Sequence, residues 1–216
     1  MTCAVKICGL TSSEAVDAAV KAGADMVGFV FFPPSPRSLN VEAAAALTQR
    51  VPNSITQVAL SVDADDAFLE AIAIRVRPNI MQLHGQEPPE RVVEVQRLCG
   101  LPVMKAIAIS GPDDVDRAYD YTAVADRIMF DAKPPEGSTR PGGNALAFDW
   151  SLIAAKDWRL PWILAGGLTP GNVVEAITAS GASAVDVSSG VENSSGVKDA
   201  EKMCAFISAA KSLDPK

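Results

Sequence analysis

Short apolar runs alternate with longer stretches of helical periodicity from one end of the chain to the other. The apolar runs have the length of buried parallel strands. We predict strands over residues 4–7, 26–31, 55–62, 80–83, 102–108, 127–130, 162–164 and 184–187. We predict helices over residues 12–22, 41–50, 64–75, 88–98, 112–121, 148–156, 170–180 and 198–212, the seventh with Thr169 as N-cap and Pro170 as first residue. The chain therefore consists of eight strand–helix units.

Eight strand–helix units in 216 residues fit an α/β fold, the (β/α)8 or TIM barrel, in which a ring of parallel strands lies inside a ring of helices. A doubly wound open sheet is the competing architecture. Its first turn would carry G-x-G-x-x-G, which this chain lacks. No shift in composition marks a linker, so we expect residues 1–216 to form a single domain.

Composition and charge narrow the classes of partner and compartment. The net charge of −7 argues against nucleic-acid and membrane partners, although a locally positive site can still bind an anionic substrate. Four scattered cysteines indicate free thiols in a reducing compartment, and one histidine excludes a multi-histidine metal site. We see no leader peptide and no apolar run near the ~20 residues of a membrane span. We expect a cytoplasmic protein.

The first strand carries the earliest candidate chemistry. Lys6 and Cys8 share one face of the strand, because side chains alternate. A cation near a thiol lowers its pKa and makes the thiolate available as a base or nucleophile. The alternative, that Cys8 is a small buried hydrophobic residue, stays open on this stretch alone.

Two glycine-rich turns follow the last two strands. Gly166-Gly167 ends the seventh, and Ser188-Ser189-Gly190 ends the eighth. In barrels these two loops frequently bind phosphate. We therefore predict a phosphate site there, although both could be ordinary loops.

Polar groups stand at the carboxyl ends of other strands, where a barrel places its active site. They are Cys8, Arg37, His84, Asp131 and Asp186. Arg37 can bind a carboxylate in bidentate fashion. Asp131 ends an apolar strand, and an apolar setting favours the protonated form of a carboxyl group. A thiolate base and a carboxylic acid on opposite sides of the mouth form an acid/base pair that needs no metal or cofactor.

The motifs resemble those of the phosphoribosylanthranilate isomerase family, in the family's order and over nearly the whole chain. They are Lys6-Ile7-Cys8-Gly9, Gly28, Ser35-Pro36-Arg37, Gln82-Leu83-His84-Gly85, Asp131, Gly142-Gly143, Phe148-Asp149-Trp150, Ala165-Gly166-Gly167-Leu168, Asn172 and Asp186-Val187-Ser188-Ser189-Gly190-Val191-Glu192. Three positions depart from the family pattern: Ala145 replaces a glycine, Ser61-Val62 an aromatic–valine pair, and Ala184 a glycine.

The resemblance implies an Amadori rearrangement of N-(5-phosphoribosyl)anthranilate to 1-(2-carboxyphenylamino)-1-deoxyribulose 5-phosphate, in tryptophan biosynthesis. It implies Asp131 as general acid, Cys8 as general base and Arg37 as partner of the anthranilate carboxylate. Asp186 would lie near the bridging nitrogen, and His84 is a further substrate-binding candidate. Phosphate would bind at Gly166, Gly167, Ser188, Ser189 and Gly190.

Other functions and the oligomeric state remain open. A Schiff-base aldolase would need a lysine at the mouth, and Lys6 and Lys105 are its candidates. A catalytically inactive phosphosugar-binding protein is a third possibility. The partner we expect is a phosphosugar substrate, for a monomer or a homodimer.

Overall fold

The computed structural model describes residues 2–133, 137, 142, 147–154 and 156–213. Eight parallel strands close into a barrel in chain order, from β1 to β8 and back to β1. The strands are β1 (Ala4–Cys8), β2 (Met26–Phe31), β3 (Thr56–Ser61), β4 (Ile80–Leu83), β5 (Val103–Ile109), β6 (Arg127–Ala132), β7 (Trp162–Leu164) and β8 (Ala184–Val187). Closure confirms the predicted (β/α)8 barrel and excludes the open sheet.

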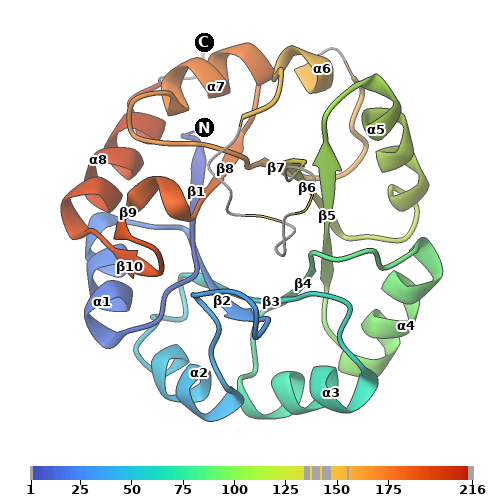
Figure 1. Ribbon diagram of the computed structural model, residues 1–216, viewed down its shortest axis with the longest axis vertical. Helices are drawn as coiled ribbons and strands as arrows, with labels where there is room; N and C mark the ends of the chain where they lie inside the picture. The colour runs from blue at the N-terminus through green and yellow to red at the C-terminus, as the bar shows by residue number, and fades with distance from the viewer. Residues whose placement is uncertain (1, 134–136, 138–141, 143–146, 155, 214–216) are drawn as a thin grey trace.

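Helices surround the barrel on all sides (Figure 1). They are α1 (Ser13–Ala22), α2 (Val41–Thr48), α3 (Asp66–Arg75), α4 (Pro89–Cys99), α5 (Pro112–Arg117), α6 (Ser151–Ala154), α7 (Val173–Ser180) and α8 (Ala200–Lys211). Side chains fix several helix starts, as where Ser12 accepts a hydrogen bond from the Ala15 amide. Among the described residues, no helix is long and apolar enough to cross a membrane.

The core has two parts because side chains alternate along each strand. Outward-facing residues such as Ile7, Phe130 and Val185 pack against the helices. Inward-facing residues such as Val58, Met104 and Met129 fill the barrel. The filled interior leaves the carboxyl ends of the strands as the floor of a pocket.

Two predicted helices begin three residues later than we expected. Thr169 is not an N-cap: the Asn172 side chain accepts a hydrogen bond from the Thr169 amide, which forms a turn, and α7 begins at Val173. Residues 148–150 are not helical, because Asp149 accepts hydrogen bonds from Ser151, where α6 begins. Residue 155, inside the predicted helix, lies outside the described residues.

Two other segments differ from the prediction. The helix predicted over 112–121 is α5 followed by a 3-10 turn, η1 (Ala118–Tyr121). A short hairpin that we did not predict, β9 (Glu192–Ser194) with β10 (Val197–Lys198), precedes α8, so that helix begins only at Ala200, with Asp199 as its cap. A second 3-10 turn, η2 (Ser189–Val191), joins β8 to this hairpin.

Candidate active site

One pocket lies at the carboxyl ends of the strands, and every candidate site residue lines it. These residues are Cys8, Arg37, His84, Asp131, Gly166, Gly167, Asp186, Ser188, Ser189 and Gly190. Because the pocket is formed by loops and strand ends from the whole chain, its members lie up to 182 positions apart (190 minus 8) in the sequence. The structure therefore brings the predicted site together.

Cys8 lies above a buried ion pair. The Lys6 side chain is completely buried, and its Nζ lies 2.7 Å from Asp186 Oδ1 on the neighbouring strand. Gly28 on β2 leaves room for both side chains, since a Cβ there would lie 2.9 Å from Cys8 Sγ and 3.3 Å from Lys6 Cε. This confirms the expectation that Lys6 and Cys8 share a face.

Burial, rather than the cation, dominates the acidity of the thiol. Burial raises the pKa of Cys8 above its ordinary value, although Lys6 acts in the opposite direction. Our expectation of a lowered thiol pKa was therefore wrong. For Lys6, burial alone would lower the pKa, but Asp186 and Cys8 outweigh burial and raise it. Lys6 thus remains a cation beneath the thiol, and a thiolate formed beside it would be a strong base.

Asp131 lies on the opposite wall of the site, in contact with His84. His84 Nε2 lies 3.1 Å from Asp131 Oδ2, and the Ala132 amide donates to Asp131 Oδ1 over 2.8 Å. The other ring nitrogen, Nδ1, lies 2.9 Å from Gln82 Nε2. These groups are nearly buried, so their hydrogen bonds are protected from water.

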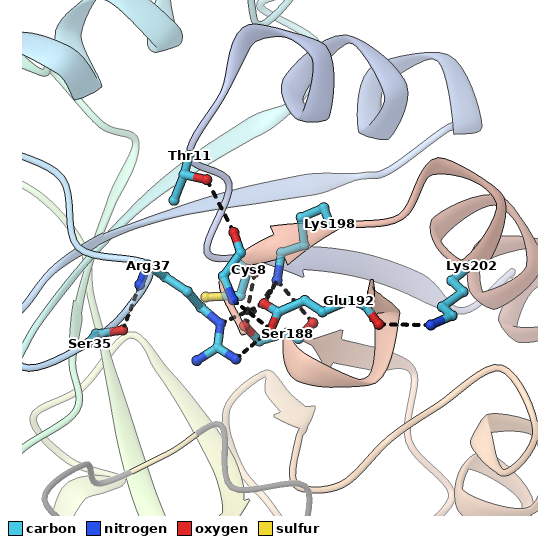
Figure 2. A network of polar contacts seen from close by, with 9 residues as sticks. Cys8, Thr11, Ser35, Arg37, Ser188, Glu192, Lys198 and Lys202 are labelled. Atoms are coloured by element: carbon cyan, nitrogen blue, oxygen red, sulfur yellow. Dashed lines mark hydrogen bonds and ion pairs between the residues drawn. The ribbon is translucent and has the colours of Figure 1, made fainter. Parts of the chain in front are cut away.

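A network of hydrogen-bonded polar side chains lies along the remaining side of the pocket (Figure 2). Glu192 accepts hydrogen bonds from Arg37 Nε at 2.7 Å and Nη2 at 2.8 Å. Lys198 donates to Glu192 at 2.7 Å and to the Ser188 carbonyl at 2.9 Å. Ser188 in turn donates to the Cys8 carbonyl at 3.1 Å. The network therefore connects the arginine, a glycine-rich turn and the end of β1.

The charges of this network are strongly coupled. Burial alone would raise the pKa of Glu192, but Arg37 and Lys198 lower it to about 2. Burial lowers the pKa of Lys198 despite its contact with Glu192. Glu192 already occupies one edge of the Arg37 guanidinium group. A bound carboxylate would therefore contact Arg37 from its Nη1 side.

The two glycine-rich turns touch each other at the mouth. A Cβ on Gly190 would lie only 1.9 Å from the Leu168 carbonyl oxygen, so this approach requires glycine. Gly166 has a φ of 88°, in the left-handed region that favours glycine. The turns therefore form one continuous rim, formed largely by main chain and small side chains, which is the usual form of a phosphate site in barrels.

Comparison with known proteins decides the family. The family model for N-(5'-phosphoribosyl)anthranilate (PRA) isomerase matches residues 5–209. The chain belongs to this family. An N-(5'-phosphoribosyl)anthranilate isomerase of Paramagnetospirillum magneticum is 55% identical over 211 residues, which cover 98% of each chain. Family membership confirms our prediction of an isomerase.

Solved structures agree with this assignment. A phosphoribosyl anthranilate isomerase in complex with reduced 1-(o-carboxyphenylamino)-1-deoxyribulose 5-phosphate has a TM-score of 0.83 and 36% identity; the match covers 98% of this chain and 100% of that one. Monomers generated from the dimeric isomerase of Thermotoga maritima have a TM-score of 0.85 and 37% identity, with the same coverage.

Several residues of the pocket and its network had no predicted role. Gln82 and Glu192 stood in the quoted motifs without a role, and Lys198 was predicted only as the first residue of the last helix. Gln82 could have been found, because it is a polar residue at an inward-facing position of an otherwise apolar strand. Of the departures, Ser61 is buried and Ala184 packs inside the barrel, whereas Ala145 lies outside the described residues, as does Gly143.

Proposed function

We propose that this chain converts N-(5-phosphoribosyl)anthranilate into 1-(2-carboxyphenylamino)-1-deoxyribulose 5-phosphate, with Asp131 as general acid and Cys8 as general base. The observation that carries the proposal is the pocket itself. A carboxyl group and a thiol lie in the same cavity as an arginine and a glycine-rich rim. The product analogue bound by one solved relative has the same carboxylate, amine and phosphate groups.

The first half of the reaction opens the sugar ring. Asp131 donates a proton to the ring oxygen, the bond from C1 to that oxygen breaks, and the nitrogen lone pair forms a C=N bond. The Schiff base that results is cationic at nitrogen. The Asp186 carboxylate, paired with Lys6, lies in the pocket and is available to stabilise this charge.

The second half moves a proton from C2. The Cys8 thiolate removes this proton, and the electron pair forms a C1=C2 bond, which gives an enolamine. Tautomerisation places a proton on C1 and leaves a ketone at C2. One carbon is reduced and its neighbour oxidised, so the step balances without an external electron acceptor. Lys6 supports the thiolate form during this transfer.

Two groups of residues in the pocket would orient the substrate. Arg37, held by Glu192, would bind the anthranilate carboxylate. The rim formed by Gly166, Gly167, Ser188, Ser189 and Gly190 would hold the phosphate. His84 contacts the acid, so its position suits orientation of Asp131 better than direct substrate recognition.

The aldolase alternative is less well supported. A Schiff-base lysine needs a free amine that can reach the substrate. The Lys105 ammonium instead lies outside the pocket, bonded to Glu87 at 3.0 Å and to the Gly85 carbonyl at 2.9 Å. Lys6 is committed to Asp186.

Cellular setting and assembly complete the proposal. We place the enzyme in the cytoplasm, which suits four cysteines that are free thiols. The net charge of −7 supports a small phosphorylated substrate rather than nucleic acid as partner. The chain would act as a monomer or a homodimer; the Thermotoga maritima relative is described as dimeric. Light scattering of the purified protein distinguishes these two states.

Turnover of the substrate tests the proposed function. Freshly prepared phosphoribosylanthranilate should lose its anthranilate fluorescence when the enzyme is added. Asp131→Asn should still bind the substrate but lower kcat by about 10²–10⁴-fold, the usual contribution of a general acid. Asp120→Asn, an exposed carboxylate outside the pocket, is the control and should behave like the wild type. Absence of turnover by the wild type, or borohydride trapping of substrate on a lysine, would contradict the proposal.

A further inference from the structure

Gln82 is a buried amide in the middle of an apolar strand. Its Nε2 atom lies 2.9 Å from His84 Nδ1 and 3.3 Å from Met129 Sδ. Its Oε1 atom is buried and has no hydrogen-bond partner among the residues that the structure describes. A buried polar atom without a partner is costly, and an apolar residue would avoid that cost. Because this cost accompanies Gln82, we infer that the hydrogen bond donated by its Nε2 atom has a function.

Gln82, His84 and Asp131 form a continuous row of hydrogen-bonding groups. His84 connects the two ends, with Nδ1 facing Gln82 and Nε2 facing Asp131 Oδ2. Gly142 packs directly against the last contact, since a Cβ there would lie 2.7 Å from Asp131 Oδ2 and 2.8 Å from His84 Nε2. The pair is thus covered by main chain as well as buried.

The amide dictates which nitrogen of the ring carries a proton. A donor from Gln82 needs a lone pair on Nδ1, so the ring proton must lie on Nε2 and be donated to Asp131. An additional proton cannot enter at Nδ1 while the amide donates there. It must therefore reside on Asp131 rather than form an imidazolium ion.

We propose that Gln82 is a positioning residue that, through His84, directs the transferable proton of the pair to Asp131. This inference rests on the proposed role of Asp131 as general acid. In the ring-opening step, the proton passes from the Asp131 carboxyl group to the ring oxygen. The carboxylate that remains is stabilised by the Nε2–H donor and the Ala132 amide. The imidazole keeps its single proton throughout, and solvent returns a proton to Asp131 after turnover.

The single histidine of the chain makes the inference directly measurable. Protein labelled with ¹⁵N-histidine yields signals from one ring, and the nitrogen shifts show which atom carries the proton. We expect the Nε2–H tautomer in the wild type. Gln82→Glu keeps the side-chain shape but replaces the donor with an acceptor. We expect a proton on Nδ1 in this variant, with kcat at least 100-fold lower and KM changed less than threefold.

Gln57→Glu is the matched control, because Gln57 also has a buried, unpartnered Oε1 among the described residues but lies outside the pocket. It should retain the wild-type spectrum and kcat. A wild-type spectrum with the proton on Nδ1 would overturn the inference even if Gln82→Glu failed to fold. So would a folded Gln82→Glu enzyme with unchanged spectrum and kcat. Failure of the wild type to turn over phosphoribosylanthranilate would instead overturn the proposed function.

Discussion

The charge states of individual residues in this pocket depend on burial as much as on charged neighbours. Lys6 has no exposed surface and would be unfavourable inside the barrel without Asp186. The charge of Lys6 offsets only part of the effect of burial on the pKa of Cys8, so the pKa of the thiol remains raised. The base is therefore held mainly in its protonated form at neutral pH, beside the cation that stabilises its ionised form.

The pH dependence of catalysis should reflect the raised pKa of Cys8. The active enzyme needs a protonated acid as well as an ionised base, so kcat/KM should fall about tenfold per pH unit once pH exceeds the thiol pKa, because ionisation of Cys8 then no longer offsets loss of the proton on the acid. Cys8→Asp replaces the thiol with a group that ionises at lower pH, and should move this limb down by several pH units while lowering the maximal rate. The measurement is kcat/KM against pH for both proteins. Coincident alkaline limbs would show that another group sets the pH dependence.

Glu192 should make the fold sensitive to acid. Its folded-state pKa of about 2 lies below the ordinary 4.5, so its stabilising effect is fully present above pH 4.5 and is lost as pH falls toward 2. Between pH 5 and pH 3 the wild type should lose about 2 kcal/mol more unfolding free energy than Glu192→Gln. Urea denaturation at both pH values measures this difference. Glu201→Gln, an exposed change on α8, should lose as much as the wild type.

At the level of elements, the strands were easier to predict than the helix starts. Buried parallel strands are short apolar runs, and each predicted strand overlaps an observed one. Helix starts depend on which side chain accepts the first free amides. Asp149 and Asp199 accept such amides at two of these starts, whereas Asn172 accepts from the Thr169 amide before α7, where a Thr-Pro pair misled the prediction.

The contact between the two glycine-rich turns should govern phosphate binding. Gly190→Ala would place a methyl group against the Leu168 carbonyl, so the turns must separate. We expect KM for the substrate and the inhibition constant of inorganic phosphate to rise at least about tenfold together, or 1.4 kcal/mol. Gly111→Ala has open space around the added carbon and should change neither constant. An unchanged phosphate affinity in Gly190→Ala would place the phosphate elsewhere.

At the scale of the whole molecule, barrel closure creates the site. Lys6 and Asp186 meet because β8 pairs with β1, and Arg37 meets Glu192 because the hairpin after β8 folds back over the β2 loop. The motifs predicted which residues line the pocket, since strand ends converge in any barrel. They could not predict which pairs form, because hydrogen-bond partners such as Gln82 and His84 depend on side-chain geometry across neighbouring positions.

The central claim is that an acid and a base in this pocket isomerise phosphoribosylanthranilate. Its most direct test is single-turnover fluorescence decay with the wild type, Cys8→Ala and Cys3→Ala. Cys3 is a second buried thiol that lies outside the pocket, so its variant controls for loss of a thiol in the same strand region. We predict rapid decay with the wild type and Cys3→Ala, and decay slowed about 10²–10⁴-fold with Cys8→Ala although substrate still binds. Equal decay rates in all three proteins would contradict the assignment of Cys8 as the base.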